Sequence, residues 1–369
     1  MARPTSATIH ADALRHNLSQ IRLRAPHSQV MAVVKADGYG HGLERVARAL
    51  GGADAFGVAA LSDAERLRAA GISQPILLLS GFDEPADIER LRGLGVDTAV
   101  HHVSQLEMLE QAGGGEPIRC WLKLDTGMHR LGFAPEDVRD AHARLMALPG
   151  VVGEVVLMNH FASSDEFGAT PRDGHSPCDG QKTRDQLRVF ADATAGLGGA
   201  RSLANSAAVL GWPDAHAQWV RPGGALYGMS VVEGSTGADF GLRPAMTLST
   251  RLIAVNRIRK GERIGYASTW ECPEDMPVGV AAIGYGDGYP RAAPAGTPVL
   301  VGGQATQVIG RVSMDLMTID LRGVAEARVG APVTLWGPEL PVERIAAAAG
   351  TIGYELTCSV TRRVRVVEQ

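Results

Sequence analysis

The sequence predicts a (β/α)8 barrel followed by a mostly antiparallel β domain. Short apolar runs alternate with amphipathic helical segments through roughly the first 230 residues, and β-rich runs between glycines and prolines follow after about residue 240. Repeated strand–helix units imply parallel strands joined by right-handed crossovers, and about eight such units close a barrel. We therefore place the barrel at residues 1–233 and the β domain at residues 234–369.

Apolar runs predict the barrel strands. The first run is continuously apolar, which is typical of a strand buried on both faces. The fourth, seventh and eighth runs are short, so the count of eight depends on the weakest segments. The runs are residues 30–34, 55–60, 76–79, 98–100, 118–124, 151–158, 202–204 and 219–220.

Amphipathic segments predict the helices around the barrel. One helix, at residues 12–24, precedes the first strand. Ser62 with Glu65, and Ser104 with Glu107, have the spacing of capping boxes that begin a helix. Further helices are expected at residues 83–95, 135–148 and 181–197.

The second domain is predicted from β-rich runs between turn residues. In this domain, only residues 342–349 have a helical pattern, and residues 231–240 form the expected linker from the barrel. Within the barrel, residues 166–180 are rich in glycine, proline and aspartate and are expected to form a surface loop. The expected strands are residues 247–258, 278–283, 298–301, 307–309, 316–321 and 333–336.

Composition restricts the class of protein. The formal net charge of −4 provides no basic field for nucleic acid or for a membrane surface. The four cysteines are far apart and form no CxxC pair, which argues against zinc ribbons and a disulfide framework, and we predict no metal site. The amino terminus lacks a secretory apolar segment, and no stretch approaches the ~20 apolar residues of a membrane span. We expect a cytoplasmic protein.

Polar side chains follow several predicted strands at their carboxyl ends. In a barrel these ends meet at one rim, where barrel enzymes build their active sites. Each residue alone could be an ordinary solvated strand-end group, but their shared position indicates a site. They are Lys35, Arg130, His160, Asn205, Ser206 and Arg221.

Lys35 lies in the segment VVKADGYGHG, residues 33–42. The apolar strand before it directs the lysine to the barrel mouth, where partial desolvation lowers the pKa of an amine and makes it a better Schiff-base nucleophile. The glycines let the following loop run close to a ligand. This segment resembles the pyridoxal-phosphate lysine motif of alanine racemases. Further motifs similar to that family follow in the family's order: KLDTGMHRLG (123–132), MNHFA (158–162), NSA (205–207), RPGGALYG (221–228), IGY (264–266), GYGDGYPR (284–291), GRVSMD (310–315) and YEL (354–356).

The resemblance implies an isomerase that interconverts L- and D-alanine, supplying D-alanine for peptidoglycan or acting in alanine catabolism. It implies that Lys35 carries pyridoxal 5'-phosphate covalently and acts as the base on one face of the substrate. Tyr266 would be the base on the opposite face, supplied by the other subunit of a homodimer. Two bases on opposite faces suit racemisation, because a proton leaves one side and returns on the other.

The resemblance also assigns the remaining site residues. Arg221, which is always charged and only donates hydrogen bonds, would face the pyridine nitrogen and disfavour its protonation. His160 would orient Arg221 or line the ring, and the phosphate would lie near the loops after the seventh and eighth strands. The implied cofactor contacts are Lys35, Tyr39, His160, Asn205, Ser206, Arg221, Gly223, Gly224 and Tyr354. The implied substrate contacts are Arg130, Tyr285, Met314 and Asp315, and Lys123 resembles a lysine often carbamylated in the family.

Three other functions remain open at this point. A related pyridoxal-dependent decarboxylase would place an acid at the pyridine nitrogen, against which Arg221 argues. A racemase of another amino acid, such as serine, would differ only in pocket shape. A non-catalytic pyridoxal-phosphate carrier would lack the β domain and Tyr266. The loop at residues 166–180 looks longer than its family counterpart, and we expect a tolerated insertion.

Overall fold

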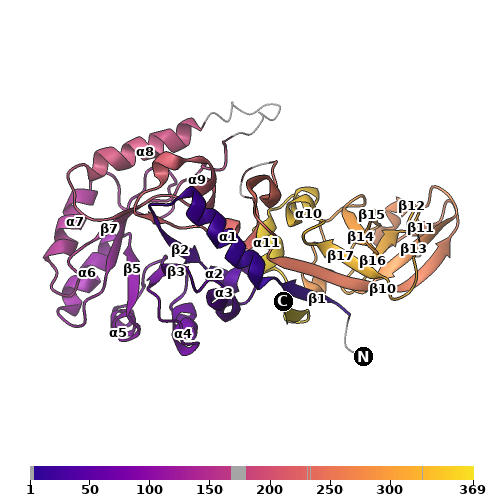
Figure 1. Cartoon of the computed structure of the whole chain (residues 1–369), viewed down its shortest axis with the longest axis horizontal. Coiled ribbons are helices and arrows are strands. Elements are labelled where there is room, and N and C mark those ends of the chain that lie inside the picture. The colour runs from indigo at the N-terminus through magenta and orange to yellow at the C-terminus, as the bar shows by residue number, and fades with distance from the viewer. Residues whose placement is uncertain (1–3, 168–179, 231, 233, 326) are drawn as a thin grey trace.

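The computed structural model describes residues 4–167, 180–230, 232, 234–325 and 327–369. A barrel wrapped in helices occupies one end of the molecule, and a β domain occupies the other (Figure 1). Most of the predicted loop at 166–180, including Cys178, and two residues of the predicted linker, 231 and 233, lie outside the described residues.

The barrel is closed and parallel, as the sequence predicts. Its strands follow one another in chain order, and the last, β9, pairs with the first, β2, through Gln29 with Trp219 and Val30 with Val220. Side chains such as Met31, Leu77 and Trp121 fill its interior. The strands are β2 (Gln29–Val33), β3 (Ala55–Val58), β4 (Ile76–Leu78), β5 (Val96–Val100), β6 (Cys120–Lys123), β7 (Val156–Met158), β8 (Arg201–Ser202) and β9 (Trp219–Val220).

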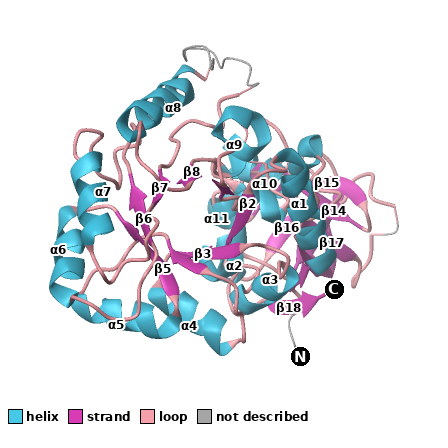
Figure 2. Cartoon of the chain, turned by 60° about the vertical axis from the view of Figure 1, so that its left-hand side comes forward, coloured by secondary structure: helices cyan, strands magenta, loops and turns pink. Residues whose placement is uncertain are grey.

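Helices surround the barrel (Figure 2). The predicted capping boxes are wrong, because the N-cap residues are Ala60 and His102, so both helices begin earlier than Ser62 and Ser104. Leu61 packs against the core, which favours the earlier start of α4. The helices are α1 (Ala11–Arg24), α2 (Lys35–Tyr39), α3 (Leu43–Ala49), α4 (Leu61–Ala69), α5 (Pro85–Leu94), α6 (Val103–Ala112), α7 (Val138–Ala147), α8 (Gln181–Thr194) and α9 (Ser206–Gly211).

The β domain is built on a mostly antiparallel sheet, in the order β13-β16-β15-β14-β17-β10-β1-β18. The long strand β10 also pairs with β13, which closes the strands from β13 to β10 into a ring. The bounds are β10 (Met246–Ile258), β13 (Met276–Ala281), β14 (Pro298–Val301), β15 (Gln304–Ile309), β16 (Met317–Asp320), β17 (Pro332–Trp336) and β18 (Arg365–Glu368), with a small separate hairpin of β11 (Arg263–Ile264) and β12 (Trp270–Glu271).

Two features of the β domain differ from the expectation. The first strand of the chain, β1 (Ser6–Ile9), pairs antiparallel with β10 and parallel with β18, so it belongs to this sheet and not to the barrel. The division at residues 233 and 234 stays a prediction. Besides α10 (Val342–Ala349), a second helix, α11 (Gly353–Cys358), was not predicted, and it lies between the sheet and the barrel (Figure 1).

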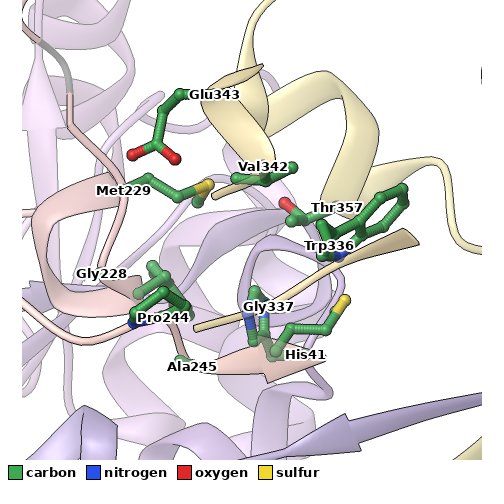
Figure 3. Close-up of a pocket in the computed structure, with 12 residues that line it drawn as sticks. His41, Gly228, Met229, Pro244, Ala245, Trp336, Gly337, Val342, Glu343 and Thr357 are labelled. Carbon is green, nitrogen blue, oxygen red and sulfur yellow. The ribbon is translucent and has the colours of Figure 1, made fainter. Parts of the chain in front are cut away.

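The junction between the barrel and the β domain is tightly packed. A cavity of about 10 Å³, room for about one water molecule, lies among His41, Met229, Trp336 and Glu343 (Figure 3). Nearby, the buried Asn17 of α1 donates from Nδ2 to the carbonyls of Leu226 (2.9 Å) and Arg243 (2.8 Å). Its Oδ1 accepts from the Arg243 amide at 2.8 Å. Asn17 therefore fixes the segment that leads from the barrel to β10. Across the described part of the chain, no helix is long and apolar enough to cross a membrane.

We predict that Asn17→Ala lowers the free energy of unfolding by about 3 kcal/mol, because it leaves buried backbone groups without partners. Urea denaturation of the variant and the parent protein measures this change. Ser19→Ala, at an exposed position of the same helix, serves as the control and should unfold with the parent. Equal midpoints for Asn17→Ala and Ser19→Ala would contradict the role of Asn17.

Candidate active site

The predicted polar residues do meet at the carboxyl-terminal rim of the barrel. Lys35 follows β2, Lys123 ends β6, His160 follows β7 and Arg221 follows β9. Burial and the charges of Arg221, Lys123, Arg130 and Lys35 hold the pKa of His160 well below its usual range. This mutual influence shows that cationic groups from different strands converge at one place, with His160 neutral among them.

Lys35 begins a left-handed turn that strand β2 directs into the rim. Ala36, Asp37, Gly38 and Tyr39 all have φ between 52° and 62°, a conformation that costs L-residues roughly 1–2 kcal/mol each. The Asp37 carboxylate holds the turn by accepting from the Leu43 amide at 3.2 Å. It also pairs with Arg66 of α4 at 2.8 Å, and Arg66 reaches Glu44 of α3 at 2.9 Å.

Gly40 ends the turn against the β domain. A Cβ atom at Gly40 would lie 2.0 Å from the carbonyl oxygen of Thr357 in α11. The close approach that requires a glycine here is therefore to protein backbone, whereas the sequence suggested an approach to a ligand. It brings α11, with Tyr354, beside the turn that carries Lys35 and Tyr39. The Tyr39 and Tyr354 rings meet edge to face, with centroids 5.6 Å apart.

The lysines of the rim have lowered pKa values. Lys35 reaches solvent, yet desolvation by the surrounding protein and the charge of Arg130 lower its pKa. Lys123 is 7% exposed, and its burial together with Arg221, Arg130 and Lys35 lowers its pKa to about 8. A larger fraction of each amine is therefore uncharged near neutral pH than for an ordinary lysine. Uncharged amines are the form that attacks carbonyl groups.

The loop that carries Arg130 is shaped by an aspartate. Asp125 Oδ1 accepts from the backbone amides of Gly127, Met128 and His129 at 2.9, 3.0 and 3.0 Å. These hydrogen bonds curl the chain after β6 and leave Arg130 exposed at the rim. A guanidinium there is free to form a paired contact with a carboxylate.

Arg221 is buried, and among the described residues it donates only to neutral oxygens. Its Nη1 donates to Ser202 Oγ at 2.5 Å, and its Nη2 donates to the carbonyls of Asn159 at 2.5 Å and Leu203 at 3.5 Å. Burial lowers the pKa of Arg221 to about 10. These bonds, and not one to His160, hold the guanidinium in the described structure, so the place of His160 beside a cofactor ring stays a prediction.

A cradle of backbone amides lies beside the tyrosines. Ser206 Oγ accepts from the amides of Gly223 (2.8 Å) and Ala225 (3.3 Å). A Cβ at Gly223 would lie 2.3 Å from Tyr39 Oη, and one at Gly224 would lie 2.1 Å from the Tyr354 ring. Asn205 Oδ1 caps α9 by accepting from the Ala208 amide at 3.0 Å, which fixes the start of the helix that carries Ser206.

The other predicted residues form a second cluster on the β domain. Tyr266 follows β11 and is 68% exposed, and Met314, between β15 and β16, is 53% exposed. Tyr285 lies beside Met314, because its amide donates to the Ser313 carbonyl at 3.1 Å, and Asp315 pairs with Arg363. The hairpin of β11 and β12 lies at the end of the molecule opposite the barrel (Figure 1). One chain therefore does not bring Tyr266 together with Lys35.

Sequence reasoning missed the residues that support the rim. Gln186 of α8 donates to Thr126 Oγ1 (3.0 Å) and to the His160 carbonyl (3.2 Å), so it joins the loops after β6 and β7. Ser202 holds Arg221, and Cys358 lies close enough to Lys35 to influence its pKa. An inward-facing position on a barrel strand is the only signal that could have indicated Ser202.

The described structure offers few candidate sites apart from the rim. A cavity of about 310 Å³ lies at the opposite, amino-terminal end of the barrel, lined by Arg68, Asp97 and Arg119 among others, and it is separate from the rim. Within the described residues, no group of three or more histidines, cysteines, aspartates or glutamates is placed to hold a metal ion. The described cysteines, Cys120, Cys272 and Cys358, are unpaired thiols.

Comparison with known proteins identifies the family. The alanine racemase N-terminal domain matches residues 9–231, and the alanine racemase C-terminal domain matches residues 245–368. The alanine racemase of Nitrosococcus oceani is 52% identical over 358 residues, which cover 97% of each chain. Among solved structures, the biosynthetic alanine racemase of Pseudomonas aeruginosa is similar with a TM-score of 0.93 at 45% identity, covering 100% of this chain and 99% of that one. The alanine racemase of Acinetobacter baumannii has a TM-score of 0.89 at 34% identity, with 100% of both chains covered. The chain therefore belongs to the alanine racemase family.

Proposed function

We propose that the protein is a pyridoxal-phosphate-dependent alanine racemase that interconverts L- and D-alanine. The observation that carries this proposal is that Lys35 lies at a rim lined with cations, while Tyr266 is exposed on the other domain and available to a second copy. The similarity to alanine racemases along the whole chain supports the substrate and the reaction. We further propose that the enzyme acts in the cytoplasm and provides D-alanine for cell-wall synthesis or takes part in alanine catabolism.

The residues of the rim fit the proposed cofactor. Lys35 offers an amine of lowered pKa for the aldehyde. The Ser206 hydroxyl accepts from the amides of Gly223 and Ala225, so its own hydrogen is available to a phosphate beside Tyr39 and Tyr354. Asn205 fixes the helix start beside Ser206, and Gly224 leaves room for the Tyr354 ring. Arg221 would provide a buried cation for the ring nitrogen, and His160 would provide an uncharged wall. The bound cofactor supplies the electron-withdrawing group that makes the substrate Cα hydrogen acidic.

The proton transfers fall to two residues of the chain. Lys35 would hold the cofactor, and its amine, when free, would move a proton at Cα on one face of the substrate, while the phenol of Tyr266 would do so on the other. Arg130 orients the substrate carboxylate through its guanidinium. The decarboxylase alternative is disfavoured by Arg221, because a buried cation opposes protonation of the pyridine nitrogen. The carrier alternative is disfavoured by the β domain that carries Tyr266.

We propose a homodimer in which each active site uses both subunits. Within one chain, α2, which begins at Lys35, lies at the junction of the two domains, whereas the hairpin of β11 and β12 that leads to Tyr266 lies at the far end of the β domain (Figure 1), so a shared site needs a second copy. Exposed apolar side chains on the β domain support a buried contact there. They are Ile253, Val255, Tyr266, Tyr285, Met314 and Leu316. In that dimer, Tyr285, Met314 and Asp315 would face the substrate bound by the partner.

We predict that wild-type protein with added pyridoxal phosphate forms D-alanine from L-alanine well above its rate with serine. Lys35→Ala and Tyr266→Phe should each lower this rate roughly a hundredfold or more, because each removes one general base. In deuterated water, each variant should exchange the Cα hydrogen of only one enantiomer, and the enantiomer should differ between the variants. Chiral chromatography and mass spectrometry measure both effects.

The control is Lys260→Ala, which removes an exposed lysine of the β domain, away from the barrel rim. This variant should keep full activity. If wild type yields only a decarboxylated amine, the decarboxylase assignment replaces ours. Cofactor binding without turnover of any amino acid would instead indicate a carrier.

We also propose that Lys123 is carbamylated, because the resulting anion would pair with Arg130. We predict a carbamate signal in carbon-13 NMR of protein equilibrated with labelled bicarbonate, absent from Lys123→Met. Carbamylation needs the neutral amine, so the signal should be present above the Lys123 pKa of about 8 and decline as the pH falls below it. The same signal in both proteins, or in neither, would contradict this modification.

A further inference from the structure

Ser202 holds Arg221 in an arrangement that contains no negative charge. The Ser202 side chain is fully buried in β8, and its Oγ accepts from Arg221 Nη1 at 2.5 Å. The other oxygens bonded to Arg221 are the carbonyls of Asn159 and Leu203. In the part of the chain that the structure describes, no carboxylate forms an ion pair with Arg221. A buried arginine without an acidic partner is uncommon, because buried charges are normally paired.

The Ser202 hydroxyl is fixed in direction by its neighbour on the next strand. Ser202 pairs with Trp219 in the parallel contact of β8 with β9, and its Oγ donates to the Trp219 carbonyl at 3.1 Å. The hydroxyl hydrogen is therefore engaged, and only lone pairs of the oxygen face Arg221. Ser202 thus acts as an obligate acceptor toward the guanidinium, the role that an aspartate would fill, but without the charge.

We infer that Ser202 is a positioning residue that sets the direction of the Arg221 guanidinium while leaving its positive charge uncompensated. This inference rests on the proposed function, in which Arg221 faces the pyridine nitrogen. An uncompensated cation beside that nitrogen disfavours its protonation, whereas a cation neutralised by a buried acid would do so less. Ser202 would then restrict the cofactor to racemisation, because a protonated ring is the stronger electron sink and favours transamination.

Ser202 provides Arg221 with an acceptor, and it adds no negative charge. Different substitutions test these two contributions separately. Ser202→Asn and Ser202→Asp introduce side chains of equal size, and only the second adds a negative charge beside Arg221. Ser202→Ala removes the acceptor without adding bulk, and Ser202→Thr keeps the hydroxyl. Threonine is well tolerated in strands, so it is the conservative replacement.

The first experiment compares purified Ser202→Asp and Ser202→Asn holoenzymes. Three quantities are measured: racemisation of alanine, conversion of the bound cofactor to its amine form, and the visible absorption spectrum of the bound cofactor as a function of pH. We expect the ratio of cofactor conversion to racemisation to be about tenfold higher in the Asp variant, which is the change expected from one pKa unit at the pyridine nitrogen. The pH at which the spectrum changes should rise in the Asp variant only. Equal ratios and equal spectra in the two variants would overturn the inference.

The second experiment covers the case in which the larger side chains prevent folding. Ser202→Ala should lower kcat for alanine about tenfold with little change in KM, and should shift the cofactor spectrum, while Ser202→Thr should restore both. Thermal melting of the cofactor-free proteins shows that the fold is intact. A wild-type spectrum and kcat in Ser202→Ala would overturn the inference. Failure of wild-type protein to racemise alanine would overturn the proposed function instead, and the Asp and Asn spectra would still report on Ser202.

Discussion

The repulsion among cationic side chains at the barrel rim is the constraint on which the site depends. Lys35, Lys123, Arg130 and Arg221 come from the ends of three strands, β2, β6 and β9, and each lowers the pKa of at least one neighbour. Such a cluster is unfavourable in the empty protein and favourable once anions arrive, whether the phosphate and carboxylate of bound molecules or a carbamate on Lys123. Binding of an anion at the rim would therefore be favoured, because it relieves the repulsion among these cations. Neutral anchors such as the Ser202 hydroxyl and the Asn159 carbonyl hold the cations in place without cancelling their charge.

The two domains make this arrangement rigid in different ways. The barrel supplies strand ends that face one rim, and the left-handed turn after Lys35 is held by Asp37 and Arg66. The β domain contributes α11. The Thr357 carbonyl of this helix packs closely against Gly40, and its Tyr354 ring lies beside Tyr39. Asn17 fixes the chain between the domains. Movement of one domain against the other would disturb the lysine turn directly, so the β domain supports the site of its own barrel in addition to carrying Tyr266.

The sequence predicted the order of the barrel strands, the rim residues and the change to antiparallel strands, because hydrophobic period and strand ends are local signals. It did not predict that β1 pairs with β10 and β18, since a strand whose partners lie more than two hundred residues away leaves no local trace. The left-handed turn was also missed, because Ala36, Asp37 and Tyr39 normally avoid positive φ. Ser202 gave only the weak signal of an inward-facing strand position, since its role exists only through Arg221, which follows the neighbouring strand.

We propose that one active site needs Lys35 from one subunit and Tyr266 from the other. The most direct measurement is the activity of a purified hybrid dimer made from one Lys35→Ala subunit and one Tyr266→Phe subunit, each with a different affinity tag. In this hybrid, one site carries both substitutions and the other carries neither. We expect about half of the wild-type activity per dimer, although each homodimeric variant is inactive. An inactive hybrid would overturn the shared site, because it would mean that Lys35 and Tyr266 act within the same chain.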